Sequence, residues 1–215
     1  LGAICIDTIR MIFRQILISV IAFTLFASCR KGYKIQNNKV YYEYWNEASG
    51  QNQDVIKNAD AESFQKLSFD CDCDFEFGKD KNHLYIDGIP IRKIDPNTFR
   101  FIGNYVFRDK DSSYFFGFYN DINNCSIKGV NPSKLKLISY PWSKEGKILI
   151  HGYDTLFLDD INTFVPIDEN WGKTNQYVIY KSKKLNGADP NTFKIISSYA
   201  GSDKKHVYEF GKIKK

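Results

Sequence analysis

Residues 70–77 form an alternating run of acidic residues and cysteines, and this is the segment of the chain best suited to hold a metal ion. The run reads Asp-Cys-Asp-Cys-Asp-Phe-Glu-Phe. Carboxylates suit Ca²⁺, but Phe75 and Lys81 stand where a calcium loop needs a turn glycine and a closing glutamate. Zinc held by Cys71 and Cys73 would need a second ligand pair at a useful spacing. We therefore expect no metal and no cofactor, and instead a half-buried strand with an acidic outer face.

The pairing of the cysteines stays open at this point. Beyond Cys29, the cysteines are Cys71, Cys73 and Cys125, an odd number. The sequence is compatible with buried thiols, or with one disulfide from Cys125 to Cys71 or Cys73. A bond between Cys71 and Cys73 would need strained local geometry, because neighbouring residues on one face of a strand diverge.

The three histidines, His83, His151 and His206, could serve in acid–base chemistry. His83 and His206 occupy the same position in two repeated segments, which favours a structural role. The chain contains no nucleophile elbow, phosphate-binding loop or dinucleotide fingerprint. We therefore expect no catalytic residues and no enzymatic activity, and a hydrolase is the least favoured of the alternatives.

Aromatic residues are abundant, with 14 Tyr, 17 Phe and 3 Trp. Exposed aromatic rings could stack on sugars or grip a partner protein. In β-repeats, however, such rings more often form the core, because each unit buries a face against its neighbour. The candidate ligand or partner surface consists of Tyr42, Tyr44, Trp45, Trp142 and Trp171.

The start of the chain has the pattern of a secretory signal. After Met11 come a basic residue, Arg14, an uncharged apolar run at residues 16–26, and small residues before Cys29. A basic start, a short apolar core and small residues at the cleavage site are typical of signal peptides. A cysteine directly after them resembles bacterial lipoproteins, whose cysteine carries acyl chains such as palmitate.

We therefore divide the chain into four parts. Residues 1–10 are interpreted as an upstream extension outside the native protein, and residues 11–28 as a lipoprotein signal peptide. Residues 29–39 are a lipidated tether, and residues 40–215 are the folded domain. The apolar run is shorter than the roughly 20 residues that a membrane span needs. We therefore expect lipid on Cys29 to hold the protein at the membrane.

Charge and anchor together indicate the cell envelope. Arg30 directly follows Cys29, which resembles lipoproteins that are not retained at an inner membrane. We expect a lipid-anchored protein on the periplasmic or outer-membrane side of a bacterial envelope.

The formal net charge is +5, but basic and acidic residues alternate throughout. This pattern indicates a solvated surface, so no nucleic-acid partner is expected.

A unit of about 30 residues repeats beyond the tether. Two copies are clearest, one at residues 79–99 and one at residues 185–208. Both contain an Asp-Lys turn followed by His-x-Tyr, and both contain Asp-Pro-Asn-Thr-Phe. Weaker copies fill the intervals between them. Residues 142–170 lack the Asp-Lys-Asn turn, so an altered surface could lie there.

Each part of the unit predicts a local structure. Asp and Asn favour turns, and the aromatic and β-branched run after them favours a strand. Asp87-Gly88 predicts a two-residue hairpin turn. Asp95-Pro96 and Asp189-Pro190 predict a cap followed by one short helical turn. A short helix is also expected at residues 60–66.

These segments resemble the DKNYY family, named after the motif that reads Asp-Lys-Asn-His-Leu-Tyr at residues 80–85. The Gly-Ala-Asp-Pro-Asn-Thr-Phe segment at residues 187–193 is also typical of that family. The resemblance covers most of residues 40–215. It implies a secreted or lipid-anchored bacterial protein. It brings no catalytic or binding residues, because the family is of unknown function.

The sequence therefore predicts an all-β fold with short helical turns. We expect tandem hairpin repeats that form an elongated, solenoid-like stack or a curved sheet. We expect an interaction or structural module that is held at the membrane by lipid on Cys29 and contacts another envelope protein. A glycan- or cell-wall-binding module is the alternative.

Overall fold

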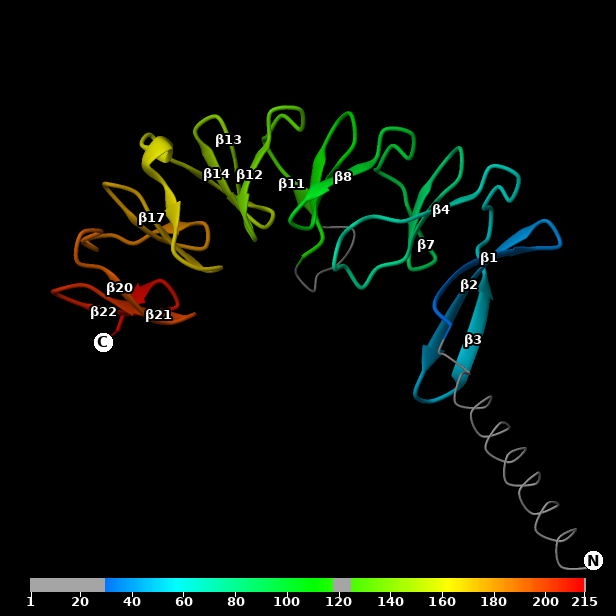
Figure 1. Ribbon diagram of the computed structural model, residues 1–215, viewed down its shortest axis with the longest axis horizontal. Helices are drawn as coiled ribbons and strands as arrows, with labels where there is room; N and C mark the ends of the chain where they lie inside the picture. Colours follow the sequence, from blue (N-terminus) through cyan, green and yellow to red (C-terminus); the bar gives the residue numbers. More distant parts are fainter. Residues whose placement is uncertain (1–29, 118–124, 215) are drawn as a thin grey trace, which may run out of the picture.

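The computed structural model describes residues 30–117 and 125–214, and over these the protein is all-β, as predicted. The strands follow one another in chain order along an arch (Figure 1). They are β1 (Gly32–Gln36), β2 (Lys39–Asn46), β3 (Gly50–Val55), β4 (Gln65–Leu67), β5 (Phe77–Lys79), β6 (Leu84–Ile86), β7 (Ile89–Ile91), β8 (Arg100–Gly103), β9 (Val106–Arg108), β10 (Ser113–Phe115), β11 (Ser126–Ile127), β12 (Lys136–Ser139), β13 (Trp142–Glu145), β14 (Ile148–His151), β15 (Asp154–Phe157), β16 (Val165–Pro166), β17 (Trp171–Lys173), β18 (Val178–Tyr180), β19 (Lys183–Lys184), β20 (Lys194–Ser197), β21 (Ala200–Ser202), β22 (Val207–Glu209) and β23 (Lys212–Ile213). One short 3-10 helix covers Ile161–Thr163.

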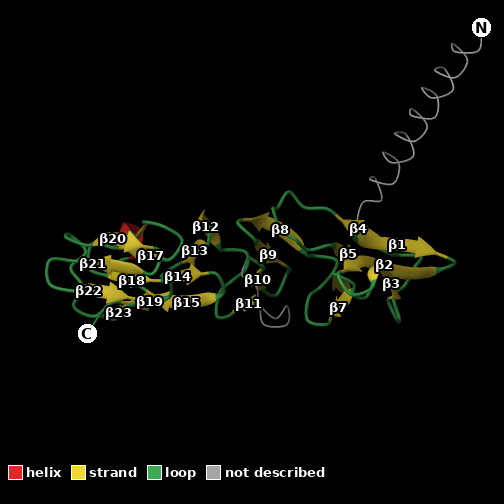
Figure 2. Cartoon of the chain, turned by 90° about the horizontal axis from the view of Figure 1, so that it is seen from below, coloured by secondary structure: helices red, strands yellow, loops and turns green. Residues whose placement is uncertain are grey.

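These strands form six separate antiparallel sheets, numbered here in chain order. Sheet 1 has three strands, β1 to β3, and sheets 2 to 6 have four strands each. Figure 2 shows the sheets side by side along the long axis of the molecule. Within the described ranges no strand pairs with a strand of another sheet. The expectation of one curved sheet was therefore wrong, because the loop after each fourth strand turns the chain so that consecutive sheets pack through their faces.

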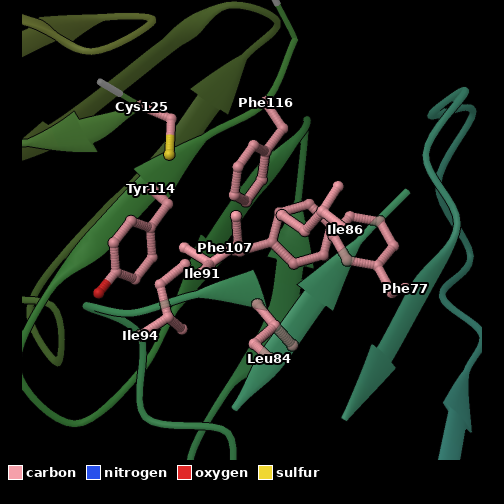
Figure 3. Close-up of a cluster of buried hydrophobic side chains, with 9 residues drawn as sticks. All are labelled: Phe77, Leu84, Ile86, Ile91, Ile94, Phe107, Tyr114, Phe116 and Cys125. Carbon is pink, nitrogen blue, oxygen red and sulfur yellow. The ribbon is translucent and has the colours of Figure 1, made fainter. Parts of the chain in front are cut away.

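The core lies between consecutive sheets. At the junction of sheets 2 and 3, Leu84 and Ile86 of β6 pack with Phe107 of β9 and Tyr114 of β10 (Figure 3). Each of the other four junctions has a cluster of its own, with side chains from the two sheets that it joins. Each thin sheet buries apolar area only through its neighbours, as expected for a repeat protein.

Antiparallel order gives each four-stranded sheet two rims. The turn between its second and third strands lies at one rim, together with the loop that enters from the preceding sheet. We call this the clamped rim; its four longer turns are residues 80–83, 109–112, 174–177 and 203–206. The turns between the first and second strands and between the third and fourth strands lie at the opposite, open rim.

The predicted hairpin at Asp87-Gly88 is confirmed at the open rim of sheet 2. Both residues have positive φ, 47° and 79°, as a type I′ turn requires. The Asp87 backbone N–H donates to the carbonyl of Glu76, eleven residues earlier. The same bond recurs at the same spacing in sheets 3 to 6. The open rims of sheets 2 to 6 therefore share this hydrogen bond, even in sheets whose sequence motif is weak.

A phenylalanine before the first strand packs on a glycine of the second strand in three sheets. Phe193 lies against Gly201, where an added Cβ would come within 2.4 Å of the ring. Phe64 with Gly78 and Phe164 with Gly172 repeat this arrangement. The absence of a side chain on the glycine lets the ring approach the strand backbone, which explains the Phe at the end of the Asp-Pro-Asn-Thr-Phe segment at residues 189–193; Phe99, at the end of the other segment, stacks on Phe107 instead.

Three local expectations are corrected. Residues 60–66 form a turn and the start of β4 rather than a helix. Asp95-Pro96 begins a hydrogen-bonded turn without a helix, although Asp95 does accept the backbone N–H of Asn97 at 3.0 Å. The expected tether at residues 29–39 contains β1, which pairs along its whole length with β2. The sheet structure therefore starts at Gly32, because Tyr33 and Ile35 supply alternate apolar side chains to that strand.

Candidate functional site

Asp80, the first residue of the repeat motif, organises the clamped rim of sheet 2. One carboxylate oxygen accepts the backbone N–H groups of Asn82 and His83, both at 2.7 Å. The other accepts the Tyr85 hydroxyl at 2.6 Å and the backbone N–H of Asp60 at 2.9 Å. Asp60 lies in the loop that enters from sheet 1. One carboxylate therefore closes its own turn, orients a core tyrosine and fixes the incoming loop.

The same arrangement, which we call the aspartate hub, occurs in two further sheets. Asp109 accepts two turn N–H groups, the Tyr114 hydroxyl and the backbone N–H of Asp95. Asp203 does the same with its own turn, Tyr208 and Asp189. The recurrence in three sheets indicates that the motif is used for folding, and its carboxylates are committed to hydrogen bonds.

Burial and hydrogen bonding act in opposite directions on the pKa of the Asp80 carboxyl. Burial alone would raise the pKa of Asp80, but the bonds from Tyr85 and the backbone N–H groups outweigh it and lower the pKa. At the edge of the hub, a bond from Lys81 helps to lower the pKa of Asp60 to about 2. The matching pairs Lys110–Asp95 and Lys204–Asp189 are 3.2 and 3.0 Å apart. The carboxylates of Asp80 and Asp60 are therefore ionised at neutral pH.

A groove between sheets 1 and 2 is lined by aromatic and acidic side chains that take no part in the aspartate hubs. Its volume is about 310 Å³, and its lining includes Tyr42, Tyr44, Asp54, Asp87 and Ile89. Tyr42 and Asp54 are directly opposite on β2 and β3, so they share one face of sheet 1. Asp87 and Ile89 come from the hairpin at the open rim of sheet 2. The groove thus depends on the stacking of the two sheets.

Two tyrosine–aspartate pairs stand in this groove. The Tyr42 hydroxyl donates to Asp87 at 2.8 Å, and burial followed by this bond raises the pKa of Tyr42. The Tyr44 hydroxyl bonds to Asp54, which raises the pKa of Tyr44. The two rings are stacked, with centroids 6.0 Å apart. Both phenols are neutral at physiological pH; the Tyr42 ring is buried, whereas the half-buried Tyr44 ring lies beside the Asp54 carboxylate.

The structure separates the five aromatic residues proposed from the sequence. Tyr42 and Tyr44 line the groove, whereas Trp45 is 49% exposed on the opposite face of β2. Trp142 and Trp171 are 1% and 0% exposed, so they do not form a ligand surface. Each donates its indole N–H to a carbonyl 26 residues later, of Asp168 and Ser197. They are core residues that join consecutive sheets.

Comparison with known proteins gives a family. The sequence model of the DKNYY family matches residues 33–212. The chain belongs to the DKNYY family. Searches of curated proteins and of solved structures each found no match. The family match agrees with the start of the sheet structure at Gly32, and it includes sheets 4 and 5, where the DKNYY motif is weak.

Sheet 5 of this DKNYY protein shows how the hub is replaced. Thr174 stands in place of the aspartate, and its hydroxyl accepts the turn N–H groups of Gln176 and Tyr177. Five residues after it, where the other hubs have tyrosine, sheet 5 has Ile179. The hydroxyl of Thr174 closes the turn, but threonine has no second side-chain oxygen that could accept the hydroxyl of a tyrosine. The loss of the carboxylate therefore accompanies the loss of the tyrosine.

The acidic, cysteine-containing segment of the DKNYY chain connects β4 and β5 at the open rim. It is no strand before Phe77, but the predicted alternation holds: Phe69, Cys71, Cys73 and Phe75 pack on the core, and Asp72 is exposed. Cys71 and Cys73 form a disulfide, contrary to the expectation from strand geometry. The chain bends at residues 70–71, which places their Cα atoms 5.2 Å apart. Cys125 is a buried thiol in the same cluster.

The three histidines lie in three different sheets. His83 belongs to the turn of sheet 2, and His206 to the equivalent turn of sheet 6. His151 is 3% exposed, and its Nε2 lies 2.9 Å from the carbonyl of Glu169, so this nitrogen carries the proton. Its ring packs edge-on against Trp142. His151 is therefore a core residue at the junction of sheets 4 and 5.

Burial lowers the pKa of His151 below its ordinary value of 6.5. Below that pH the unfolded chain binds a proton that the folded chain excludes, so stability is expected to fall with acidification. Urea unfolding at about pH 7.5 and about pH 5.5 measures this difference. His151→Gln is expected to reduce the loss, because glutamine does not titrate. An unchanged loss in that variant would contradict the assignment.

Other expectations concern ligands and membranes. Across residues 30–117 and 125–214, no group of three or more His, Cys, Asp or Glu side chains is arranged to hold a metal ion. The same residues contain no helix of sufficient length and apolar character to cross a membrane. Cys29, the expected signal peptide at 11–28 and the expected extension at 1–10 lie outside the described residues.

Proposed function

We propose that this DKNYY protein is a lipid-anchored, non-enzymatic interaction module of the bacterial cell envelope. Acyl chains on Cys29 would hold it on the periplasmic or outer-membrane side. The stacked sheets would act as a solenoid-like scaffold that presents a binding surface to another envelope protein. The signal pattern in the sequence and the repeat architecture support this assignment.

The groove between sheets 1 and 2 is the observation that carries the proposal. The hub carboxylates and the two buried tryptophans serve the fold, whereas the groove presents the half-buried ring of Tyr44 and the exposed carboxylate of Asp54. Val55 and Ile89 at its edge are 46% and 53% exposed. A groove with apolar edges and a few polar groups is the usual form of a recognition site. The groove lies between the first two sheets, which follow the proposed anchor residue Cys29 in the sequence.

Glycan binding is the second candidate, and the same groove favours it. Stacked tyrosines beside carboxylates can hold a sugar, because the ring face contacts its C–H groups and the carboxylates accept its hydroxyls. Tyr44 and Asp54 would be the contact residues. Under this alternative, the lipid on Cys29 only tethers the protein near the cell wall.

Crosslinking in cells tests the proposal. The full-length tagged protein is crosslinked, and the captured material is identified by mass spectrometry, beside Cys29→Ser and Tyr44→Ala variants. We expect one discrete protein partner that is lost in both variants, and retained in a Trp45→Ala control. Capture of wall or glycan fragments by both the parent and Cys29→Ser would favour glycan binding. Capture that is unaffected by Tyr44→Ala would overturn the groove assignment.

A further inference from the structure

We infer that the groove between sheets 1 and 2 receives a lysine side chain from an extended segment of the partner protein. This inference rests on the proposed function and names the chemistry of its partner. Asp54 would hold the ammonium group, and Tyr44 would offer its ring to the cation. Ile89 would contact the aliphatic stem.

The two tyrosine–aspartate pairs differ in whether the aspartate also has an ion-pair partner within the chain. Asp87 accepts the Tyr42 hydroxyl and the backbone N–H of Glu76, and it also pairs with the ammonium of Lys31 at 3.3 Å. Asp54 bonds to the Tyr44 hydroxyl, but no ion pair to Asp54 occurs in the described part of the chain. The first pair is thus an internal example of what the second can bind.

Charge complementarity selects a cation for the second pair. Asp54 is exposed on β3, and the neighbouring phenol of Tyr44 is a neutral donor that brings no positive charge to it. An ammonium placed there would gain a charge-assisted hydrogen bond and lie beside a tyrosine ring. The chain uses such a contact elsewhere: the Lys184 ammonium lies 4.1 Å from the centre of the Tyr177 ring.

The apolar edge of the groove selects a long aliphatic stem. Ile89, from the hairpin of sheet 2, lines the groove and is 53% exposed. A lysine stem of four methylene groups can cover such a surface while its charged end stays hydrated. Arginine would bring a planar group suited to bidentate pairing, whereas the Asp54 carboxylate is shared with the Tyr44 hydroxyl. A neutral sugar would form no ion pair with Asp54.

The test uses the full-length protein in detergent and short capped glycine peptides as probes. One peptide contains lysine at its centre, a second contains acetyl-lysine and a third contains norleucine. Binding is followed by NMR shifts of the Tyr44 and Asp54 backbone amides. We expect only the lysine peptide to shift them, and its affinity to fall at high salt.

Two matched substitutions locate the contact. Asp54→Asn keeps the shape of the side chain and is expected to weaken binding of the lysine peptide by about tenfold or more, since a charge-assisted bond is lost. Asp70→Asn, at an exposed acidic residue outside the groove, is expected to leave it unchanged. Equal shifts from the acetyl-lysine peptide, no shift from any peptide, or shifts from an N-acetylglucosamine oligomer alone would overturn the inference.

The outcomes separate this inference from the proposed function. If crosslinking captures a partner that Tyr44→Ala loses, while the lysine peptide does not bind, the partner uses another chemistry and only the inference fails. If the lysine peptide binds in the groove but cells yield no partner, the proposed function fails and the chemistry of the groove stands.

Discussion

Replacing Trp171 with alanine is expected to lower the free energy of unfolding by about 3–5 kcal/mol. The indole is fully buried, and its ring lies 4.6 Å from Tyr180 and 5.0 Å from Phe193, measured between ring centres. Because Phe193 precedes the first strand of sheet 6, the cavity would open between sheets 5 and 6. Urea unfolding measures the loss, and hydrogen exchange in β20 to β22 shows where it occurs.

Trp45→Ala is the matched control for this prediction. Trp45 is 49% exposed, so its truncation is expected to change stability by no more than about 0.5 kcal/mol. Trp171→Phe keeps most of the ring volume but removes the N–H bond to the Ser197 carbonyl, so it should cost less than Trp171→Ala. Similar losses for Trp45→Ala and Trp171→Ala would show that Trp171 does not join the sheets.

Asp80→Ala is expected to cost about 2–4 kcal/mol. The substitution leaves two turn N–H groups, a core phenol and the N–H of Asp60 without their acceptor. The lowered pKa of Asp80 adds a pH dependence: its contribution is present above the unfolded value near 3.9 and is lost as the pH falls further. Denaturant unfolding at neutral pH measures the loss.

The control and a rescue make this prediction specific. Asp70→Ala, at an exposed carboxylate outside the hub, is expected to stay within about 0.5 kcal/mol of the parent. The double variant Asp80→Thr with Tyr85→Ile copies the pair that sheet 5 uses naturally, Thr174 and Ile179. It should lose less stability than the sum of its single variants. Additive losses would mean that the carboxylate and the phenol act independently.

Much of the fold was predictable from the sequence because its signals are local. Asp87-Gly88 indicates a hairpin within two residues, and the alternation from Phe69 to Phe77 indicates which side chains face the core. The disulfide at Cys71–Cys73 was missed because the sequence does not indicate the bend that makes it possible. Strand geometry argues against it, and only a bend at residues 70–71 brings the two cysteines together.

The candidate site was only half predictable. Tyr42 and Tyr44 are conspicuous in a cluster of aromatic residues, but Asp54 and Asp87 come from different sheets and meet only through stacking. Trp142 and Trp171 were misread because an aromatic residue alone does not show whether it is buried. A usable signal was present: the two tryptophans hold the same place in consecutive units, and a phenylalanine follows each at the next junction.

The two rims have different freedom to accept extra residues. Three hubs fix the clamped rim, so a change in turn length there would remove an acceptor from four donors at once. The connection between β4 and β5, residues 68–76, lies at the open rim of sheet 2, at the same rim as the hairpin that contributes Asp87 to the groove. Loop exchange at the open rim would therefore alter recognition while the frame stays intact. The stacked sheets and their clamped rim form a fixed frame, whereas the open rim can accept different loops. The open rim is therefore the place to graft new binding loops.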